Sequence, residues 1–303
     1  MKTNLIVILG PTASGKTALA ARLAEDFRGE VISADSRQVY RGMDIGTGKD
    51  LSEFRRQEKT IPCHLIDILD PQQEFNVYEF QKRFYRIFER LAQRKTLPVL
   101  VGGTGLYLES VLTDYVLPPA RPDENLRREL DGKPLGELQE ILLAMKPDLH
   151  NKTDLEDRFR LIRKIEIEKA RNEMKGGDGV RPNISAGVFG VAWERSELRR
   201  RIAKRLRQRL DGGMIEEVKS LREKGVSWER LDSFGLEYRF IAHYLQDKIR
   251  REEMEERLRI AIGQFAKRQM TWFRRMEKKG VRIEWIAGDR YDVLCSRVRD
   301  LLA

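Results

Sequence analysis

The chain has 303 residues, 41% of them hydrophobic, and its 58 Lys and Arg residues against 48 Asp and Glu give a formal net charge of +10. Its only cysteines, Cys63 and Cys295, have no metal-ligand spacing, and no apolar run approaches the ~20 residues of a transmembrane helix. These features exclude a disulfide-stapled domain, a structural zinc site and a membrane partner. We therefore expect a cytoplasmic protein, and the positive charge favours a polyanionic partner.

Short apolar runs alternate with helical patterns in the first hundred residues. We expect strands at 5–9, 30–33, 64–69 and 97–101 and helices at 18–27 and 76–95, the second capped by Asn76, with loop and a little helix over 42–62. Strands that alternate with helices predict an α/β fold whose parallel sheet is covered on both faces. Ligands of such folds bind at the carboxyl ends of the strands.

The pattern becomes mainly helical after residue 118. We expect helices at 123–130, 134–145 and 155–171, a glycine-rich break at 176–179, a strand at 184–193, an Arg-rich helix, further helices at 214–223 and 250–279, a strand at 281–286 and a C-terminal helix. This order predicts a P-loop α/β core of the nucleotide-kinase kind over 1–117, a helical insertion domain over 118–180, and the rest of the core with a basic helical lobe over 181–303.

A phosphate-binding motif lies between the first strand and the first helix. Gly10-Pro-Thr-Ala-Ser-Gly-Lys-Thr17 matches G-x-x-x-x-G-K-[ST]. In such a loop the backbone N–H groups point inward, Lys16 adds a cation, and the Thr17 hydroxyl can ligate Mg²⁺ at a helix N-terminus. The motif predicts a site for a di- or triphosphate but does not specify which compound.

Two further segments follow expected strands and so should lie beside this loop. Asp35-Ser-Arg-Gln38 offers a carboxylate that could accept a proton or hold hydrated magnesium, although Asp-x-x-Gln also resembles a helix capping box. Gly102-Gly-Thr-Gly-Leu-Tyr107 stands where most P-loop NTPases place an acid on Mg²⁺, and Asp67 or Asp70 could supply that acid instead. The glycine–threonine turn suits gripping a diphosphate or a base better than hydrolysing ATP.

Basic residues gather in the last hundred residues. One cluster on the Arg-rich helix comprises Arg195, Arg199, Arg200, Arg201, Lys204, Arg205, Arg207 and Arg209, and a second comprises Lys267, Arg268, Arg274, Arg275, Lys278 and Lys279. The second is interleaved with Phe265, Trp272 and Phe273, a pattern that can stack unpaired bases but also fits buried aromatics beside a solvated face. Together the clusters favour nucleic acid as the partner.

The motifs, taken in order, resemble those of the tRNA dimethylallyltransferases, which transfer an isopentenyl group to the N6 amine of adenosine 37 beside the anticodon. The resemblance rests on 10–17, Asp35-Ser-Arg-Gln-Val-Tyr40, Asp44-Ile-Gly-Thr47, 102–107, 157–166 and Phe265-Ala-Lys-Arg-Gln-x-Thr-Trp-Phe-Arg274, which cover nearly the whole chain. It implies a monomeric enzyme that uses dimethylallyl diphosphate and Mg²⁺ and binds the anticodon stem-loop of tRNA.

The resemblance also implies roles for individual residues. The diphosphate would be held by Gly10, Pro11, Thr12, Ala13, Ser14, Gly15, Lys16, Thr17, Arg201 and Arg205, with Mg²⁺ on Thr17. Asp35 would take the proton from N6, and Thr104 would act near the target nucleotide. Contacts to tRNA would come from Asp35, Ser36, Arg37, Gln38, Thr104, Arg127, Phe159, Arg160, Leu161, Ile162, Arg163, Phe234, Gly235, Leu236, Glu237, Tyr238 and Arg239.

The chain departs from the family pattern at three places. Phe234-Gly-Leu-Glu-Tyr-Arg239 replaces a commoner Ile-Gly-Tyr type of segment, Asp157-Arg-Phe-Arg160 is a variant of the usual pattern, and Lys49-Asp50 stands where many members have Lys-Pro.

The sequence leaves three alternative functions open. They are a prenyltransferase acting on free AMP, ADP or ATP, a small-molecule or nucleoside kinase in which Asp35 activates a hydroxyl, and a non-enzymatic P-loop RNA-binding protein. Only the tRNA enzyme uses both the diphosphate motifs and the basic helices.

Overall fold

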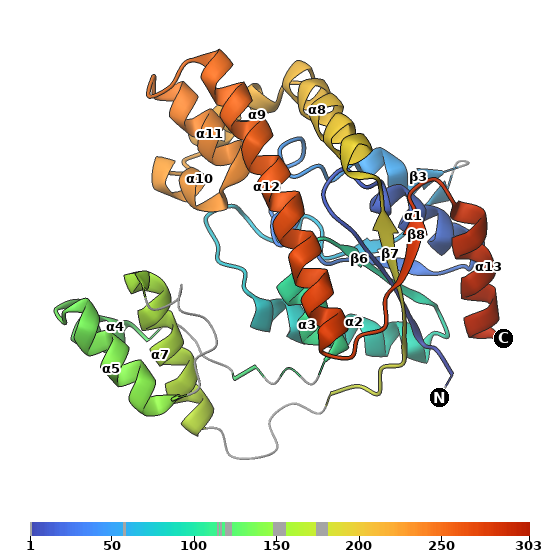
Figure 1. Cartoon of the computed structure of the whole chain (residues 1–303), viewed down its shortest axis with the longest axis horizontal. Helices are drawn as coiled ribbons and strands as arrows, with labels where there is room; N and C mark the ends of the chain where they lie inside the picture. The colour runs from blue at the N-terminus through green and yellow to red at the C-terminus, as the bar shows by residue number, and fades with distance from the viewer. Residues whose placement is uncertain are drawn as a thin grey trace. The chain divides into compact units, whose positions relative to one another are not determined.

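The computed structural model describes residues 2–56, 59–113, 115, 117–118, 123–147, 156–173 and 181–303. The chain divides into two compact units (Figure 1). Met1–Asp114 and Pro182–Ala303 form one, here called the core unit, and Tyr115–Arg181 form the other, the insertion unit. The chain returns to the core unit at residue 182. Asn4 binds this segment, because its side chain donates to Asn183 O and accepts from Ser185 N, both at 2.8 Å.

A parallel sheet of six strands forms the centre of the core unit, in the order β5-β2-β6-β1-β7-β8. The strands are β1 (Leu5–Leu9), β2 (Glu30–Ser33), β5 (Cys63–His64), β6 (Pro98–Gly102), β7 (Ala186–Ala192) and β8 (Glu284–Ala287). Every residue of β1, β2 and β6 is buried, as expected for strands covered on both faces. The neighbouring order β2-β6-β1 brings the segments that follow these strands to one edge of the sheet.

Helices cover both faces of the sheet (Figure 1). One face carries α1 (Lys16–Asp26) and α13 (Tyr291–Leu302), and the other carries α2 (Val77–Gln93), α3 (Gly105–Leu112) and α12 (Arg251–Lys278). Phe80, Phe84 and Phe88 recur every fourth residue of α2 and are buried against the sheet. The predicted N-cap is confirmed, because Asn76 Oδ1 accepts a hydrogen bond from Glu79 N at 3.0 Å.

A buried carboxylate fastens α12 to α3. The Glu109 side chain is fully buried and accepts from Trp272 Nε1 at 2.7 Å, from Arg275 Nη2 at 3.0 Å and from Lys279 Nζ at 2.5 Å. Burial alone would raise the pKa of Glu109, but the hydrogen bonds from Lys279 and Arg275 outweigh it and leave the pKa below its usual value. Glu109 is therefore a charged anchor for the carboxyl-terminal half of α12.

The remaining helices of the core unit pack on the amino-terminal half of α12. They are α8 (Arg195–Asp211), α9 (Met214–Glu223), α10 (Trp228–Phe234) and α11 (Leu236–Leu245). Their shared core also includes Val39, Tyr40 and Met43 from the segment after β2. The predicted helical lobe is thus packed against the loops of the sheet.

The insertion unit contains α4 (Glu124–Asp131), α5 (Leu135–Met145) and α7 (Arg158–Glu173). Leucines of all three helices form its core, and Asp123 caps α4 through hydrogen bonds from Asn125 N and Leu126 N. The predicted helices are confirmed within a few residues. Residue 155 and the glycine-rich break at 176–179 lie outside the described residues.

The third predicted strand is largely wrong. Only Cys63 and His64 pair in the sheet, because Leu65 and Asp67 adopt left-handed backbone conformations with φ of 63° and 53° and turn the chain out of it. Leu69 then forms an isolated parallel bridge with Tyr40. The loop predicted over 42–62 contains a 3-10 turn, η1 (Leu51–Phe54), and the short pair β3 (Arg55–Arg56) and β4 (Lys59–Thr60).

Among the residues that the structure describes, no helix combines the length and the apolar character needed to cross a bilayer.

Candidate active site

The P-loop connects β1 to α1 and is held from outside by two side chains. Arg201 Nε donates to Ala13 O at 3.1 Å, and Trp193 Nε1 donates to Ser14 O at 2.9 Å. The Arg201 guanidinium also lies 4.2 Å from the centre of the Trp193 ring. Because these carbonyls are engaged from α8 and the end of β7, the unsatisfied N–H groups of the first turn of α1 remain for an anion.

A basic cavity of about 1040 Å³ opens in front of the P-loop. Its basic lining comprises Lys16, Lys49, Arg200, Arg201, Lys204, Arg205 and Arg209, and its acidic lining comprises Asp44, Asp50, Glu53 and Glu197. Burial, together with the charges of Arg205 and Arg209, lowers the pKa of Lys16 to about 8, against the opposing charges of Asp35 and Asp50. A buried lysine beside two arginines indicates a site for a multiply charged anion.

Asp35 lies in an adjoining pocket of about 220 Å³. This pocket and the basic cavity share four lining residues, Lys16, Thr17, Arg205 and Arg209. Asp35 Oδ1 accepts from Arg37 N at 2.9 Å, and no helix begins at this segment, so the capping-box interpretation is not supported. Thr104 Oγ1 accepts from Ser36 N at 3.1 Å, which ties the Asp35 segment to the turn after β6.

Arg37 and Gln38 also make contacts inside the core unit. Arg37 donates from Nε to Phe234 O at 3.1 Å and from Nη2 to Ser233 O at 3.2 Å. Burial lowers the pKa of Arg37. Gln38 accepts from Ser33 Oγ at 2.9 Å and donates to Gly48 O at 3.1 Å. Both side chains therefore position the walls of the Asp35 pocket.

The glycine turn after β6 is explained largely by close packing. Gln269 of α12 accepts from Thr12 N at 2.8 Å and donates to Gly103 O at 2.9 Å, so it joins the P-loop to this turn. A Cβ on Gly103 would come within 2.2 Å of Gln269 Nε2, and a Cβ on Gly105 would come within 2.4 Å of the Trp272 ring. The turn thus allows α12 to approach the site, in addition to presenting Thr104.

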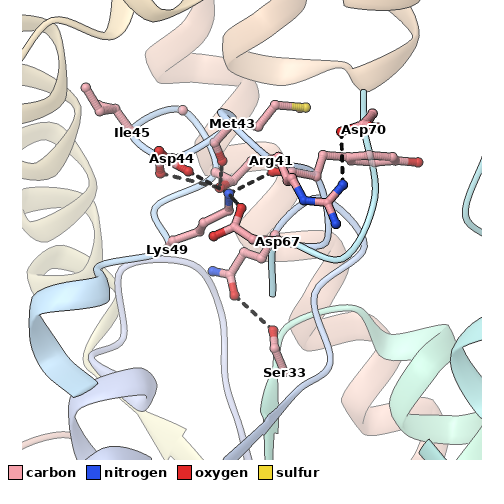
Figure 2. Close-up of polar contacts among 12 residues, drawn as sticks. Ser33, Arg41, Met43, Asp44, Ile45, Lys49, Asp67 and Asp70 are labelled. Carbon is pink, nitrogen blue, oxygen red and sulfur yellow. Dashed lines mark hydrogen bonds and ion pairs between the residues drawn. The ribbon is translucent and has the colours of Figure 1, made fainter. Parts of the chain in front are cut away.

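A fully buried lysine organises the loop between the two pockets (Figure 2). Lys49 Nζ donates to Tyr40 O at 2.7 Å and to Asp44 Oδ1 at 2.6 Å, and it also pairs with Asp67. Asp70 pairs instead with Arg41 at 3.0 Å. Neither Asp67 nor Asp70 lines the P-loop cavity, so the structure does not support either as the acid of an NTPase.

The same loop is clamped on its other side by Glu217 of α9. The Glu217 carboxylate accepts from the backbone N–H groups of Asp44, Ile45 and Gly46 at 2.8, 2.6 and 3.0 Å. It also accepts from the Tyr238 hydroxyl at 2.7 Å. Residues 44–49 are therefore a rigid partition between the basic cavity and the Asp35 pocket.

We predict that Lys49→Met lowers the free energy of unfolding by about 1–3 kcal/mol, because Tyr40 O loses its buried donor and two carboxylates lose their cation. The partly exposed carboxylates of Asp44 and Asp67 keep the loss below that of a fully buried pair. Urea denaturation measures the change. Lys219→Met, at an exposed position of α9, removes the same charge and should change stability by less than about 0.5 kcal/mol. Equal effects of the two changes would contradict the prediction.

Comparisons with known proteins agree with this geometry. The IPP transferase family matches residues 38–276. The chain belongs to the IPP transferase family. An isopentenyl transferase family also matches residues 3–66. A protein named tRNA dimethylallyltransferase 1 from Syntrophus aciditrophicus is 55% identical, covering 99% of this chain and 98% of that protein. A tRNA dimethylallyltransferase 2 from Pelobacter propionicus is 52% identical, covering 94% of this chain and 90% of that protein.

Solved structures place the fold in the same group. The crystal structure of the full-length tRNA isopentenylpyrophosphate transferase from Bacillus halodurans matches with a TM-score of 0.72 and 32% identity, covering 99% of this chain and 97% of that one. A eukaryotic dimethylallyltransferase acting on tRNA has a TM-score of 0.80 at 23% identity, covering 98% and 77% of the two chains, and supports the fold alone. This IPP transferase is thus an enzyme of the prenyltransferase class with the predicted α/β fold.

The basic clusters of this IPP transferase are only partly free for a nucleic acid. On α12, Lys267, Arg268 and Arg274 are exposed, whereas Arg275 and Lys279 bind Glu109. Phe265 lines the Asp35 pocket, whereas Phe273 is buried against the sheet. Phe273 therefore agrees with the alternative prediction of buried aromatics beside a solvated face. The basic residues Arg195, Arg199, Arg200, Lys204 and Arg207 of α8 are exposed as well. Both helices therefore contribute basic side chains to the surface of the core unit.

The insertion unit of this IPP transferase holds the predicted contacts on α4 and α7. Arg127 and Arg163 both bind the buried Glu166 carboxylate, at 2.7 and 2.8 Å. Phe159 is 85% exposed, whereas Leu161 and Ile162 lie in the core of the unit. Phe159 and Arg160 are therefore the exposed residues of the 159–163 segment.

The 234–239 segment joins α10 to α11, and Gly235 makes the turn with φ of 74°. Phe234 and Tyr238 are buried, and Glu237 pairs with Arg209 at 3.2 Å. The sequence reasoning did not single out Arg209 or Gln269 as site residues. The spacing of Arg201, Arg205 and Arg209, four residues apart on one helix, could have indicated Arg209.

The oxygen atoms that line the cavity of this IPP transferase are of the kind that bind magnesium when a bound anion supplies further ligands. The Thr17 hydroxyl lines the cavity together with carboxylates, and Mg²⁺ prefers oxygen ligands. In the described part of the chain, no group of three or more His, Cys, Asp or Glu residues could hold a metal alone. The donor set therefore suits an ion that phosphate oxygens help to coordinate.

Proposed function

We propose that this enzyme transfers a dimethylallyl group from dimethylallyl diphosphate to the N6 amine of adenosine 37 in tRNA, giving N6-dimethylallyladenosine and diphosphate. One observation carries the proposal. The P-loop cavity and the Asp35 pocket meet at Lys16, Thr17, Arg205 and Arg209. A diphosphate in the first and a base in the second would bring the carbon that is attacked to the junction.

The reaction needs a good leaving group and an aligned amine. The N6 lone pair forms a bond to C1 of the prenyl group, the C1–O bond breaks, and its electrons leave on the diphosphate. Lys16, Arg201, Arg205 and the P-loop backbone (Gly10, Pro11, Thr12, Ala13, Ser14, Gly15 and Thr17) would hold the developing charge. Asp35 would accept the N6 proton, and Thr104 would keep the Asp35 segment in place through its bond to Ser36 N.

Magnesium held by Thr17 would neutralise charge on the departing diphosphate when bound. The P-loop thereby serves a prenyl donor in place of ATP. Because both pockets are formed within one chain, we infer that the enzyme acts as a monomer, and we place it in the cytoplasm with its tRNA substrate.

The predicted tRNA contacts remain part of the proposal. Asp35, Ser36, Arg37, Gln38 and Thr104 surround the Asp35 pocket, which would receive an extruded adenine. Phe234, Gly235, Leu236, Glu237 and Tyr238 also line this pocket and, with Arg239, would act there. The outer contacts would come from Arg127, Phe159, Arg160 and Arg163, with the buried Leu161 and Ile162 supporting them from the core of the insertion unit. The exposed Phe159 ring could stack on an unpaired base.

Transfer of labelled dimethylallyl diphosphate to unmodified tRNA, and separately to AMP and ATP, tests this function. We expect label only on the tRNA, at an adenosine beside the anticodon. Label on a free nucleotide would support the free-nucleotide prenyltransferase. Consumption of ATP without transfer would show that the P-loop holds a different ligand.

The pKa of Lys16 predicts a pH dependence of donor binding. A bound diphosphate would raise this pKa from about 8 toward the usual lysine value, so binding takes up a proton above pH 8. Above about pH 7, where the terminal phosphate of the donor is already fully ionised, affinity should fall as pH rises through 8, by up to about tenfold per pH unit. Calorimetry in buffers of different ionisation enthalpy measures the proton uptake. Lys16→Arg should remove it, and an affinity that is flat to pH 9.5 would contradict the assignment.

A further inference from the structure

Arg209 presents unused hydrogen-bond donors to the junction of the two pockets. Its side chain is 12% exposed, and Nη1 donates to Glu237 Oε1 at 3.2 Å and to Gly46 O at 3.4 Å. No residue in the described part of the chain accepts a hydrogen bond from its Nε or Nη2. Two of the three guanidinium nitrogens therefore have no acceptor among the described residues.

The partition loop is shaped to admit this guanidinium. A Cβ on Gly48 would lie 1.6 Å from Arg209 Nη2 and 2.5 Å from Arg205 Nη2. Gly48 also has a φ of 61°, which favours glycine. The loop thus allows two arginines of α8 to lie against its backbone, where a side chain would push both away.

The charges around Arg209 call for an anion. Burial is the main cause that lowers the pKa of Arg209, and the positive charge of Arg205 lowers it further. The negative charge of Glu237 acts in the opposite direction. Burial in turn raises the pKa of Glu237, with Arg209 as the opposing charge. Lys16, Arg205 and Arg209 share the junction, and Glu237 is the carboxylate paired with Arg209. Arg205 pairs in turn with Asp50. The lining of the basic cavity as a whole holds seven Lys and Arg side chains against four Asp and Glu side chains, and a diphosphate would balance this excess of positive charge.

We propose that Arg209 is a further catalytic residue of the transfer, which binds the diphosphate at the side of the breaking C1–O bond, and that Glu237 is its positioning residue. The inference rests on the proposed function, since it takes the diphosphate as the leaving group. Arg201 lines the P-loop cavity alone, whereas Arg209, like Lys16 and Arg205, also lines the Asp35 pocket. Arg209 therefore stabilises charge where it develops, and its removal should affect turnover more than donor binding.

Arg209→Met tests the catalytic role. We expect the affinity for inorganic diphosphate, measured by calorimetry, to fall about threefold to tenfold, and the single-turnover rate at saturating donor and tRNA to fall about 30- to 300-fold. Arg209→Lys should recover part of the rate, since it keeps the charge but not the forked donors. Arg207→Met, on the exposed side of the same helix, removes one charge and should leave both quantities within twofold.

Thermal unfolding separates loss of function from loss of fold. Because Arg209→Met leaves a buried carboxylate unpaired, the double variant Arg209→Met/Glu237→Leu provides a second test with both charges removed. It should be as slow as Arg209→Met while unfolding at a higher temperature. A folded variant with wild-type diphosphate affinity and wild-type rate would overturn the catalytic role of Arg209.

Glu237→Gln tests the positioning role, because the amide keeps the shape and an acceptor for Arg209 but loses the charge. We expect kcat to fall about threefold to tenfold with KM for tRNA unchanged. A raised KM for tRNA with unchanged kcat would leave Glu237 as a tRNA contact alone and overturn its positioning role. If the wild-type enzyme bound diphosphate but did not prenylate tRNA, the proposed function would fail, and diphosphate binding would still decide whether Arg209 belongs to the site.

Discussion

Asp35→Asn should slow transfer to tRNA by about 10²- to 10⁴-fold while tRNA binding stays nearly unchanged. The asparagine oxygen can still accept from Arg37 N, as Asp35 Oδ1 does at 2.9 Å, so the turn keeps its shape. The amide cannot take the N6 proton, and this loss acts on the chemical step. Single-turnover kinetics measure the rate, and a gel-shift or filter-binding titration measures tRNA affinity.

The control for this prediction is Ser36→Ala, next to Asp35. It keeps the backbone N–H that donates to Thr104 and leaves the carboxylate in place, so its rate should fall by less than about tenfold. If Asp35→Asn transferred the prenyl group at the wild-type rate, Asp35 would not be the general base. A loss of tRNA binding equal to the loss of rate would make Asp35 a binding residue only.

Lys16→Ala should lower kcat/KM for dimethylallyl diphosphate by about 10²-fold or more, with the affinity for tRNA kept. Lys16 lies between the P-loop and the junction of the two pockets and donates to Pro11 O at 3.3 Å. Removal of its charge weakens the donor complex and leaves the departing diphosphate less neutralised. Steady-state kinetics with the donor varied at saturating tRNA measure the change.

Lys204→Ala is the matched control, since Lys204 lines the same cavity but is exposed on α8 and lies outside the junction. We expect it to change kcat/KM for the donor by less than about tenfold. If Lys16→Ala left both KM and kcat for the donor unchanged, the P-loop would not be the diphosphate site.

Much of the site could be predicted because it follows three strands of one parallel sheet. The segments after β1, β2 and β6 reach the same edge, which explains why the P-loop, Asp35 and Thr104 were assigned to one place. Their order along the chain also agrees with the family to which the protein belongs. Local pattern and strand topology were sufficient for this part.

The rest depends on contacts between distant segments. Gln269 is 257 positions from Thr12, and Glu217 is 173 positions from Asp44, so no local pattern indicates either hydrogen bond. The left-handed residues Leu65 and Asp67 ended the third strand, although the apolar pattern continued. The spacing on α8 indicated a basic face, but only the packing shows that part of this face lines the cavity.

Gln269 limits how the two halves of the site can be redesigned. Its oxygen accepts from the P-loop and its nitrogen donates to the turn after β6, and the close approach of its nitrogen forbids a side chain at position 103. An engineer who alters α12 to admit a larger nucleobase would therefore also displace Thr12 at the donor site. Variants selected for a new acceptor should be screened for donor affinity as well, because one side chain supports both.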